Sequence, residues 1–383
     1  MQKVNYFQVP SKIISGVGAV ERVGEEAKRL GARKALIVTQ KGILSLADNI
    51  MESLHRNGIA FEVFDDIEPE PSIETADTCG EHVRKGHFDL VVGIGGGSVL
   101  DVAKAGAMLG ANEGSIRKYI GIDLVPKPGL PSIMIPTTAG TGSEQSYHSI
   151  LFNRQEKSKQ AVISSKLFTS AAIVDPVMTV PMPQAVTAAS GMDALVHAIE
   201  AYVSVNAYVL TNVLAIEAIE MIASALRSAY ANGQDVEARY KMVMASLLAG
   251  MADCNAGTGA VHAAAYPLGG TYQIPHGTAN GLMLPYVMEY NLVGDLKKFS
   301  EIAGAMGQPI HGLNLRDAAI SSVAAVRQLS KDINMPQRLR ELNVPERDIP
   351  TLAEDMMKVT RLLANNPRKV TLEDAKSIYA NAW

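Results

Sequence analysis

The stretch LVVGIGGGSVLDVAKA at residues 90–105 combines an apolar run, a glycine-rich turn and a segment with helical periodicity. The turn contains Gly95, Gly96 and Gly97, whose backbone can approach an anion closely. Ser98 is well placed to cap the helix that follows, and the free N–H groups of such a helix stabilise a pyrophosphate. The alternative is a tight strand-to-helix turn that merely requires glycine. The spacing also departs from G-x-G-x-x-G, so this is not a standard dinucleotide-binding turn.

A second loop of the same kind follows another apolar run. IPTTAGTGSE at residues 135–144 carries Thr137, Thr138 and Thr141, whose hydroxyls can bind phosphate, ribose or the nicotinamide amide. Loops at successive strand ends of a parallel sheet converge on one crevice. The two loops together predict a nucleotide-binding site.

The order of apolar segments predicts the fold class. Runs of strand length occupy residues 35–38, 90–93, 133–135 and 171–174, and helical patterns lie between them. This alternation predicts a parallel sheet flanked by helices on both faces. After VPMPQ at 180–184 only helical patterns remain, at residues 185–204, 207–231, 236–253, 296–306, 315–333, 349–364 and 371–381. We therefore expect an α/β domain at 1–180 and an all-α domain at 181–383.

The composition excludes several classes of function. The 383 residues include 35 Lys and Arg against 39 Asp and Glu, and a net charge of −4 gives no basic face for nucleic acid. The apolar windows near 89–109 and 242–252 are short or broken, and no signal peptide is apparent, so we expect a cytoplasmic protein with no membrane span. Two cysteines exclude a disulfide framework, which leaves eight histidines and the carboxylates for any metal chemistry.

One cluster of histidines and an aspartate has the pattern of a metal site. Asp193 and His197 are four residues apart and share one helix face, although a single pair of this kind is more often structural. His262 and His276 follow among small residues and glycines. One carboxylate and three imidazoles form a borderline site suited to Fe²⁺ or Zn²⁺. Glu200 lies on the same helix face. It is either a residue that contacts a metal ligand or simply an exposed charge on the helix.

Four motifs in this order are similar to a known family. They are residues 93–105, 136–144, 191–204 and 259–280, and they resemble those of the iron-containing (group III) alcohol dehydrogenases. The resemblance implies a dehydroquinate synthase-like architecture, with an N-terminal dinucleotide-binding α/β domain and a helical C-terminal domain. It also implies reversible hydride transfer between NAD(P) and a small alcohol or aldehyde, in a homodimer or a higher homo-oligomer.

The resemblance also assigns site residues. It makes Asp193, His197, His262 and His276 the metal ligands, with Fe²⁺ or Zn²⁺ as the metal. The implied cofactor contacts are Gly95, Gly96, Gly97, Ser98, Asp101, Thr137, Thr138, Thr141 and Lys159.

Two positions depart from the family pattern. Gln40 replaces an Asp that many NAD-dependent members carry after the first strand, which leaves the choice between NAD and NADP open. Tyr266 replaces a histidine implicated in proton relay. A phenol with an ordinary pKa near 10 is a poor base at neutral pH, so Tyr266 is expected to hydrogen-bond or orient the substrate.

The residues expected on the substrate side are unusually polar. They are Gln145, Ser146, His148 and Asp253. They indicate a substrate with polar groups beyond the reacting carbon. The alternative is sequence drift without functional meaning at a surface rim. The competing functions are a zinc glycerol dehydrogenase-like or 3-dehydroquinate synthase-like enzyme, and a metal- or nucleotide-binding sensor without chemistry.

Overall fold

The computed structural model describes residues 4–156 and 158–383, and this part of the chain forms two compact units. The α/β unit comprises residues 8–138 and 142–181. The helical unit comprises residues 4–7, 139–141 and 182–383. The tip of the threonine loop, residues 139–141, thus groups with the helices rather than with the sheet from which the loop begins.

The α/β unit is built on a six-stranded parallel sheet with the order β1-β9-β6-β4-β2-β3. The strands are β1 (Ile13–Ser15), β2 (Lys34–Val38), β3 (Ala60–Phe64), β4 (Leu90–Gly95), β6 (Ser132–Pro136) and β9 (Ala171–Val174). The four apolar runs of the sequence are β2, β4, β6 and β9, which confirms their prediction as parallel strands. The short β1 and the partly exposed β3 carry no such run and were not anticipated.

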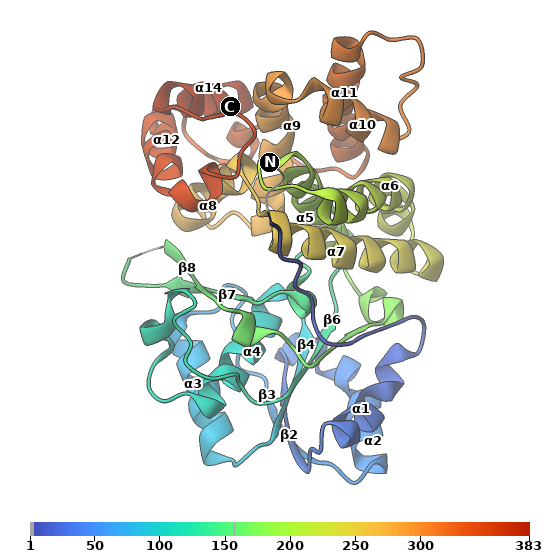
Figure 1. Ribbon diagram of the computed structural model, residues 1–383, viewed down its shortest axis with the longest axis vertical. Coiled ribbons are helices and arrows are strands. Elements are labelled where there is room, and N and C mark those ends of the chain that lie inside the picture. Colours follow the sequence, from blue (N-terminus) through green and yellow to red (C-terminus); the bar gives the residue numbers. More distant parts are fainter. Residues whose placement is uncertain (1–3, 157) are drawn as a thin grey trace. The chain divides into compact units, whose positions relative to one another are not determined.

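Helices cover both faces of this sheet (Figure 1). On one face α1 (Val23–Arg29) and α2 (Asp48–Arg56) share a core with Ala35 and Ile37 of β2. On the other face α3 (Ile73–Lys85) and α4 (Gly97–Ala111) share a second core with Leu36 and Val38. Because alternate residues of one strand enter different cores, the strand must be apolar throughout.

A smaller three-stranded sheet lies in the same unit, with the order β5-β8-β7. It consists of β5 (Gly121–Ile122), β7 (His148–Asn153) and β8 (Ser158–Ile163), and β7 pairs antiparallel with β8. Its strand β7 begins four residues after the threonine loop and packs against α4.

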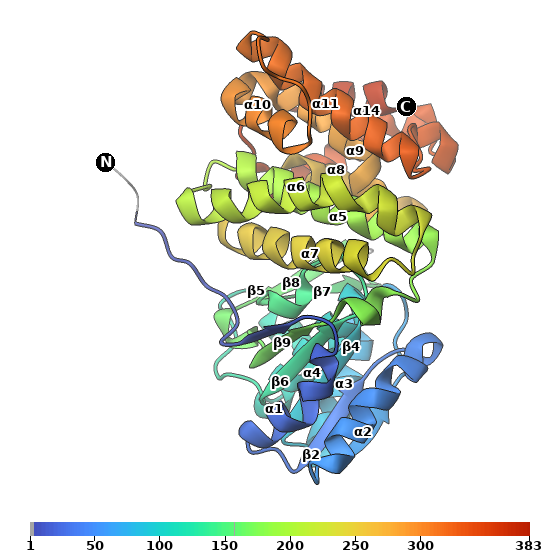
Figure 2. The ribbon, with the colours of Figure 1, turned by 90° about the vertical axis from the view of Figure 1, so that its right-hand side faces the viewer.

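The helical unit is a stack of packed helices (Figure 2). Its helices are α5 (Gln184–Val203), α6 (Val209–Ala231), α7 (Val236–Ala256), α8 (Ala260–Tyr272), α9 (His276–Asn291), α10 (Leu296–Ala305), α11 (Leu315–Asp332), α12 (Ile349–Lys358), α13 (Thr360–Leu363) and α14 (Leu372–Ala382). The sequence did not predict α8 and α9, whose interiors contain Pro267 and Pro285.

Among the residues that the structure describes, one helix, α6, is long and apolar enough to cross a bilayer by length and composition, with a window of mean hydropathy 1.7. This segment is not one of the apolar windows expected from the sequence, near residues 89–109 and 242–252. The helix packs against both α5 and α7. Core helices pass the same test of length and composition, and the contacts of α6 are those of a helix in a packed unit.

Candidate metal and cofactor site

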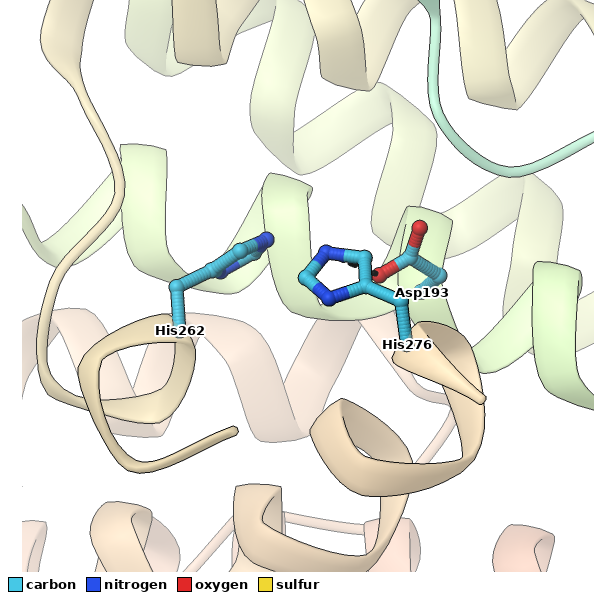
Figure 3. A group of neighbouring side chains, drawn as sticks. All are labelled: Asp193, His262 and His276. Carbon is cyan, nitrogen blue, oxygen red and sulfur yellow. Dashed lines mark ion pairs between the residues drawn. The ribbon is translucent and has the colours of Figure 1, made fainter. Parts of the chain in front are cut away.

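Three helices of the helical unit bring the predicted metal ligands together. Asp193 and His197 lie on α5, His262 lies in the first turn of α8, and His276 is the first residue of α9. The donor atoms of Asp193, His262 and His276 all lie within 4.8 Å of one another, and the three side chains face a common point (Figure 3). Asp193 and His262 are buried, whereas His276 is partly accessible.

His197 lies beside this group without belonging to the closest set. Its Nδ1 is 4.0 Å from Oδ2 of Asp193, and its ring centre is 4.7 Å from that of His262. The Nδ1 atom is buried and has no hydrogen-bond partner. A buried polar atom without a partner is costly, so a cation beside it would supply an interaction that the protein lacks. The donor set of imidazoles and one carboxylate fits Fe²⁺ or Zn²⁺.

Glu200 fixes the tautomer of His262. One carboxylate oxygen lies 2.6 Å from Nδ1 of His262, and the other accepts from the backbone N–H of Val261 at 2.6 Å. A carboxylate only accepts hydrogen bonds, so Nδ1 carries the proton and the Nε2 lone pair of a neutral His262 stays available. Of the two interpretations of Glu200, the structure therefore supports the partner of a predicted ligand over an exposed charge.

Charge pairing compensates for the burial of the cluster. Burial raises the pKa of Asp193, but the three nearby histidines and the amide of Asn280 lower it, and the net shift is downward. Burial lowers the pKa of His262, but Glu200 and then Asp193 raise it, and the net shift is upward. Both shifts reflect the proximity of carboxylate and imidazole groups, which offsets part of the cost of burial.

Small residues permit the close approach of α9 to α5. A Cβ atom at Gly277 would lie 2.3 Å from the backbone oxygen of Ala189 and 3.3 Å from Cβ of Asp193. Any side chain at this position would push the start of α9, and with it His276, away from Asp193. The glycine next to His276 is thus required by the packing that assembles the cluster.

Two predicted residues and one unpredicted residue flank the cluster. The ring centre of the partly buried Tyr266 is 6.1 Å from that of His276. Asp253 lies in the last turn of α7, and its charge interacts with those of His197 and His262. The unpredicted residue is Arg361 on α13, a helix that packs on α8, and it interacts electrostatically with Tyr266 and Asp253.

The environment of Tyr266 bears on its chemical role. Burial raises the pKa of its phenol, the charge of Arg361 opposes that change, and the net shift is upward. Tyr266 therefore keeps its proton at neutral pH, as expected of a hydrogen-bond donor rather than a base.

In the α/β unit, the helix after the glycine turn begins two residues earlier than the sequence suggests. The N-cap of α4 is Gly96, without a side-chain cap, and the helix starts at Gly97. The prediction that Ser98 is the N-cap is wrong, because Ser98 lies inside the first turn and its hydroxyl donates to the carbonyl of Pro69. A long helix with an uncapped N-terminus retains free N–H donors for an anion.

The threonine loop is attached to this turn. The backbone N–H of Thr137 donates to the carbonyl of Gly95 at 2.9 Å. A Cβ atom at Gly96 would lie 3.4 Å from the methyl group of Thr138. Both loops thus leave adjacent strands, β4 and β6, at the same edge of the sheet, as the sequence predicts.

A buried ion pair on α4 holds the end of the threonine loop and the residues that follow it through hydrogen bonds. Nζ of Lys104 lies 3.0 Å from Oδ1 of Asp101 and donates to the carbonyl of Ser143 and the hydroxyl of Ser146. Asp101 also accepts from the Ser143 hydroxyl at 2.6 Å and the Ile150 N–H at 3.0 Å. Both carboxylate oxygens of Asp101 are therefore used within the protein, as is the hydroxyl of Ser146.

The remaining predicted residues of this unit lie near the two loops or at strand ends. Lys159 forms an ion pair with Glu70 at 3.0 Å, next to the carbonyl that Ser98 contacts. Gln40 is an extended, partly exposed residue directly after β2 and Thr39. Gln145 is fully buried, and His148 begins β7 with its ring edge-on to Tyr147.

The tip of the threonine loop packs on the helix that carries Asp193. A Cβ atom at Gly140 would lie 2.8 Å from both the Cβ atom and the backbone oxygen of Ser190, which precedes Asp193 on α5. Thr141 is exposed beside this contact. The loop therefore begins after β6 in the α/β unit, and its tip belongs to the helical unit.

Glu144 is a buried acid at the end of this loop, and its Oε1 has no hydrogen-bond partner. Burial raises its pKa from 4.5 to about 7, against smaller opposing effects of its own backbone and of Lys104. The folded protein thus binds this proton more tightly than the unfolded chain. The contribution to stability is complete below pH 4.5 and is lost as the pH rises through 7, by about 3 kcal/mol.

We expect the substitution Glu144→Gln to remove this pH dependence. The free energy of unfolding of the variant and of the wild type is measured with urea at pH 4.5 and at pH 8. The difference, variant minus wild type, should be about 3 kcal/mol larger at pH 8 than at pH 4.5. The exposed Glu113 provides the control, and Glu113→Gln leaves the profile as in the wild type. An equal difference at both pH values for Glu144→Gln would contradict the expectation.

Comparison with known proteins assigns the family. Residues 10–176 match the iron-containing alcohol dehydrogenases, and residues 187–383 match the C-terminal part of the same family. The chain belongs to the iron-containing alcohol dehydrogenase family, and it is an oxidoreductase of alcohols and aldehydes. The resemblance seen in the sequence, the fold class and the reaction class are thereby confirmed.

Individual relatives cover the whole chain. The 1,3-propanediol dehydrogenase of Klebsiella pneumoniae is 41% identical over 381 residues, which is 98% of each protein. A crystal structure of 1,3-propanediol oxidoreductase aligns with a TM-score of 0.97 at 40% identity over all of both chains. The sulfoacetaldehyde reductase of Bifidobacterium kashiwanohense, solved with NAD⁺, aligns with a TM-score of 0.90 at 33% identity, over 100% of this chain and 99% of that one. Iron and NAD fit a protein of this family.

Proposed function

We propose that this protein catalyses reversible, NAD-linked reduction of a small polar aldehyde at a metal site formed by Asp193, His197, His262 and His276. The observation that carries the proposal is the convergence of these side chains from α5, α8 and α9, with a buried His197 nitrogen that lacks a partner. We further propose that residues 1–180 bind the cofactor and that residues 181–383 hold the metal.

The cofactor is proposed to lie on the two connected loops of the α/β unit. The uncapped N-terminus of α4 at Gly96 and Gly97 offers N–H donors to a pyrophosphate, and Ser98 lies in the same turn. Thr137 and Thr138 lie beside this turn, and Thr141 follows in the same loop. The role of Asp101 is indirect, because its carboxylate holds the loop through Ser143 and Ile150.

Each residue of the site has a defined part in the chemistry. When bound, the metal supplies a Lewis acid for the substrate oxygen, and the nicotinamide supplies or accepts the hydride. Glu200 keeps the proton on Nδ1 of His262 and so directs Nε2 into the cluster. Tyr266 keeps its phenolic proton and orients the substrate by donating a hydrogen bond.

The polar character of the substrate is supported by the charges beside the cluster. Asp253 interacts with His197 and His262, and Arg361 interacts with Asp253 and Tyr266. These charged groups favour a substrate with hydroxyl, amino or acidic groups beyond the reacting carbon. The relative that acts on sulfoacetaldehyde is a family member whose substrate carries such a group.

Kinetics with a panel of aldehydes test the substrate class. We expect kcat/KM, measured by NADH oxidation, to be at least about tenfold higher for hydroxy-, amino- or acidic aldehydes than for butanal, which corresponds to about 1.4 kcal/mol in the transition state. Asp253→Leu should reduce this preference, while the exposed Glu354→Leu on α12 should not. A clear preference for plain alkanals would contradict the proposed substrate class.

The cofactor, the assembly and the location complete the proposal. Gln40 replaces a carboxylate that would repel a 2′-phosphate, so we propose that NADPH is also accepted, and the same assay measures its kcat/KM. We propose a homodimer as the smallest assembly and the cytoplasm as its location. Cys79 and Cys254 are both buried and form no disulfide bond, which is consistent with a reducing compartment.

A further inference from the structure

Asn280 occupies the centre of the metal cluster, although the sequence motifs gave it no role. It lies on α9, one turn after His276, and is completely buried. Its Nδ2 is 2.7 Å from Oδ1 of Asp193. The same nitrogen is 3.1 Å from Nε2 of His262 and 3.1 Å from Nε2 of His276. One amide group thus contacts the donor atoms of all three residues in the closest set.

Two of these contacts, those with Asp193 and His262, have a defined hydrogen-bond direction. The carboxylate of Asp193 can only accept, so the amide nitrogen donates to it. Glu200 holds the proton of His262 on Nδ1, so Nε2 of a neutral His262 accepts as well. The two amide N–H groups therefore donate to lone pairs of Asp193 and His262 that a cation would use.

The other end of the same amide shows what determines its orientation. Oδ1 of Asn280 is buried and has no hydrogen-bond partner. An unsatisfied buried carbonyl oxygen costs free energy, which the contacts of the amide nitrogen must offset. The cluster of acceptor atoms, rather than the surroundings of the carbonyl oxygen, holds the side chain in place.

We propose that Asn280 is a positioning residue of the metal site, which holds Asp193, His262 and His276 in a binding-competent arrangement before the metal enters. This inference rests on the proposed function, because it requires that the cluster bind a metal. Preorganised donors lose less freedom on binding, and residues that orient metal ligands typically contribute 10–100-fold to metal affinity.

Metal affinity of two variants tests this role. Asn280→Leu keeps the approximate shape of the side chain and removes the donors, and Asn280→Ala removes the side chain without a clash. We expect the dissociation constant for Zn²⁺, measured by competition with a chromophoric chelator, to rise roughly 10–100-fold in both variants. The d–d absorption of the Co²⁺-loaded protein should also change, because the ligands are held less firmly.

The matched control is Asn112, a buried asparagine of the α/β unit that donates to the carbonyl oxygens of Met108 and Lys127 at 2.8 and 3.0 Å. Asn112→Leu should lower Tm of the metal-free and metal-loaded protein equally and leave the Zn²⁺ dissociation constant unchanged. In the Asn280 variants, the rise in Tm on adding a fixed Zn²⁺ concentration should become smaller, because it depends on affinity.

The outcomes separate the two proposals. If the wild type binds Zn²⁺ and both Asn280 variants bind it with unchanged affinity, the positioning role is overturned and the proposed function stands. If the wild type itself binds neither Zn²⁺ nor Co²⁺ at the cluster, the proposed metal site fails, and the role of Asn280 fails with it.

Discussion

Replacement of His262 by alanine is expected to abolish metal binding and nearly all turnover while the helical content is retained. His262 contributes one of the three donor atoms that lie within 4.8 Å of one another. Its removal also leaves Glu200 without the imidazole that it contacts at 2.6 Å. If Lewis-acid activation contributes about 4 kcal/mol to the reaction, its loss lowers kcat/KM roughly a thousandfold.

Metal analysis, NADH oxidation and circular dichroism of His262→Ala check this expectation together. The control is His311→Ala, because His311 is exposed and lies between α10 and α11. The control should keep the metal content and the activity of the wild type. Unchanged kcat/KM in a His262→Ala protein that contains no metal would refute the proposed role of the cluster.

The second large effect is expected for Lys104→Met, which removes the cation of the buried pair with Asp101. The side chain of Lys104 is fully buried, and that of Asp101 is 14% exposed. Removal of one partner leaves an uncompensated buried charge, which typically costs 3–5 kcal/mol. Because Lys104 also holds Ser143 and Ser146, we expect KM for NADH to rise more than kcat falls.

Two further variants distinguish this pair from an ordinary salt bridge. Lys85→Met removes an exposed lysine paired with Glu81, and we expect its effect on the free energy of unfolding to stay below about 1 kcal/mol. Asp101→Asn combined with Lys104→Met removes both charges and should recover part of the lost stability. A cost for Lys104→Met as small as that for Lys85→Met would contradict the argument.

The sheet could be predicted from the sequence because its strands have a physical signature. Strands β2, β4, β6 and β9 are buried on both faces, so each reads as an uninterrupted apolar run. The edge strand β3 has one face exposed and lacks this pattern. Helices α8 and α9 were missed because Pro267, Pro285 and several glycines conceal their periodicity.

The candidate site was predictable where residue type alone determines the chemistry. Carboxylate and imidazole side chains at helical spacing identified Asp193 and His197, and the structure places His262 and His276 beside them. Asn280 and Lys104 were not found, because an asparagine and a lysine acquire their roles only from contacts across the fold. The hydrogen bond from the Ser98 hydroxyl to the carbonyl of Pro69, 29 residues away in the sequence, also forms only in the folded chain.

The most direct test of the central claim is NADH oxidation by metal-stripped protein before and after titration with Fe²⁺. The substrate is the preferred aldehyde of the panel, and metal content is measured in the same samples. We expect no turnover without metal and activity that rises linearly to one Fe²⁺ per chain, with no such recovery in His262→Ala. Full activity of the metal-free protein would contradict the proposed function.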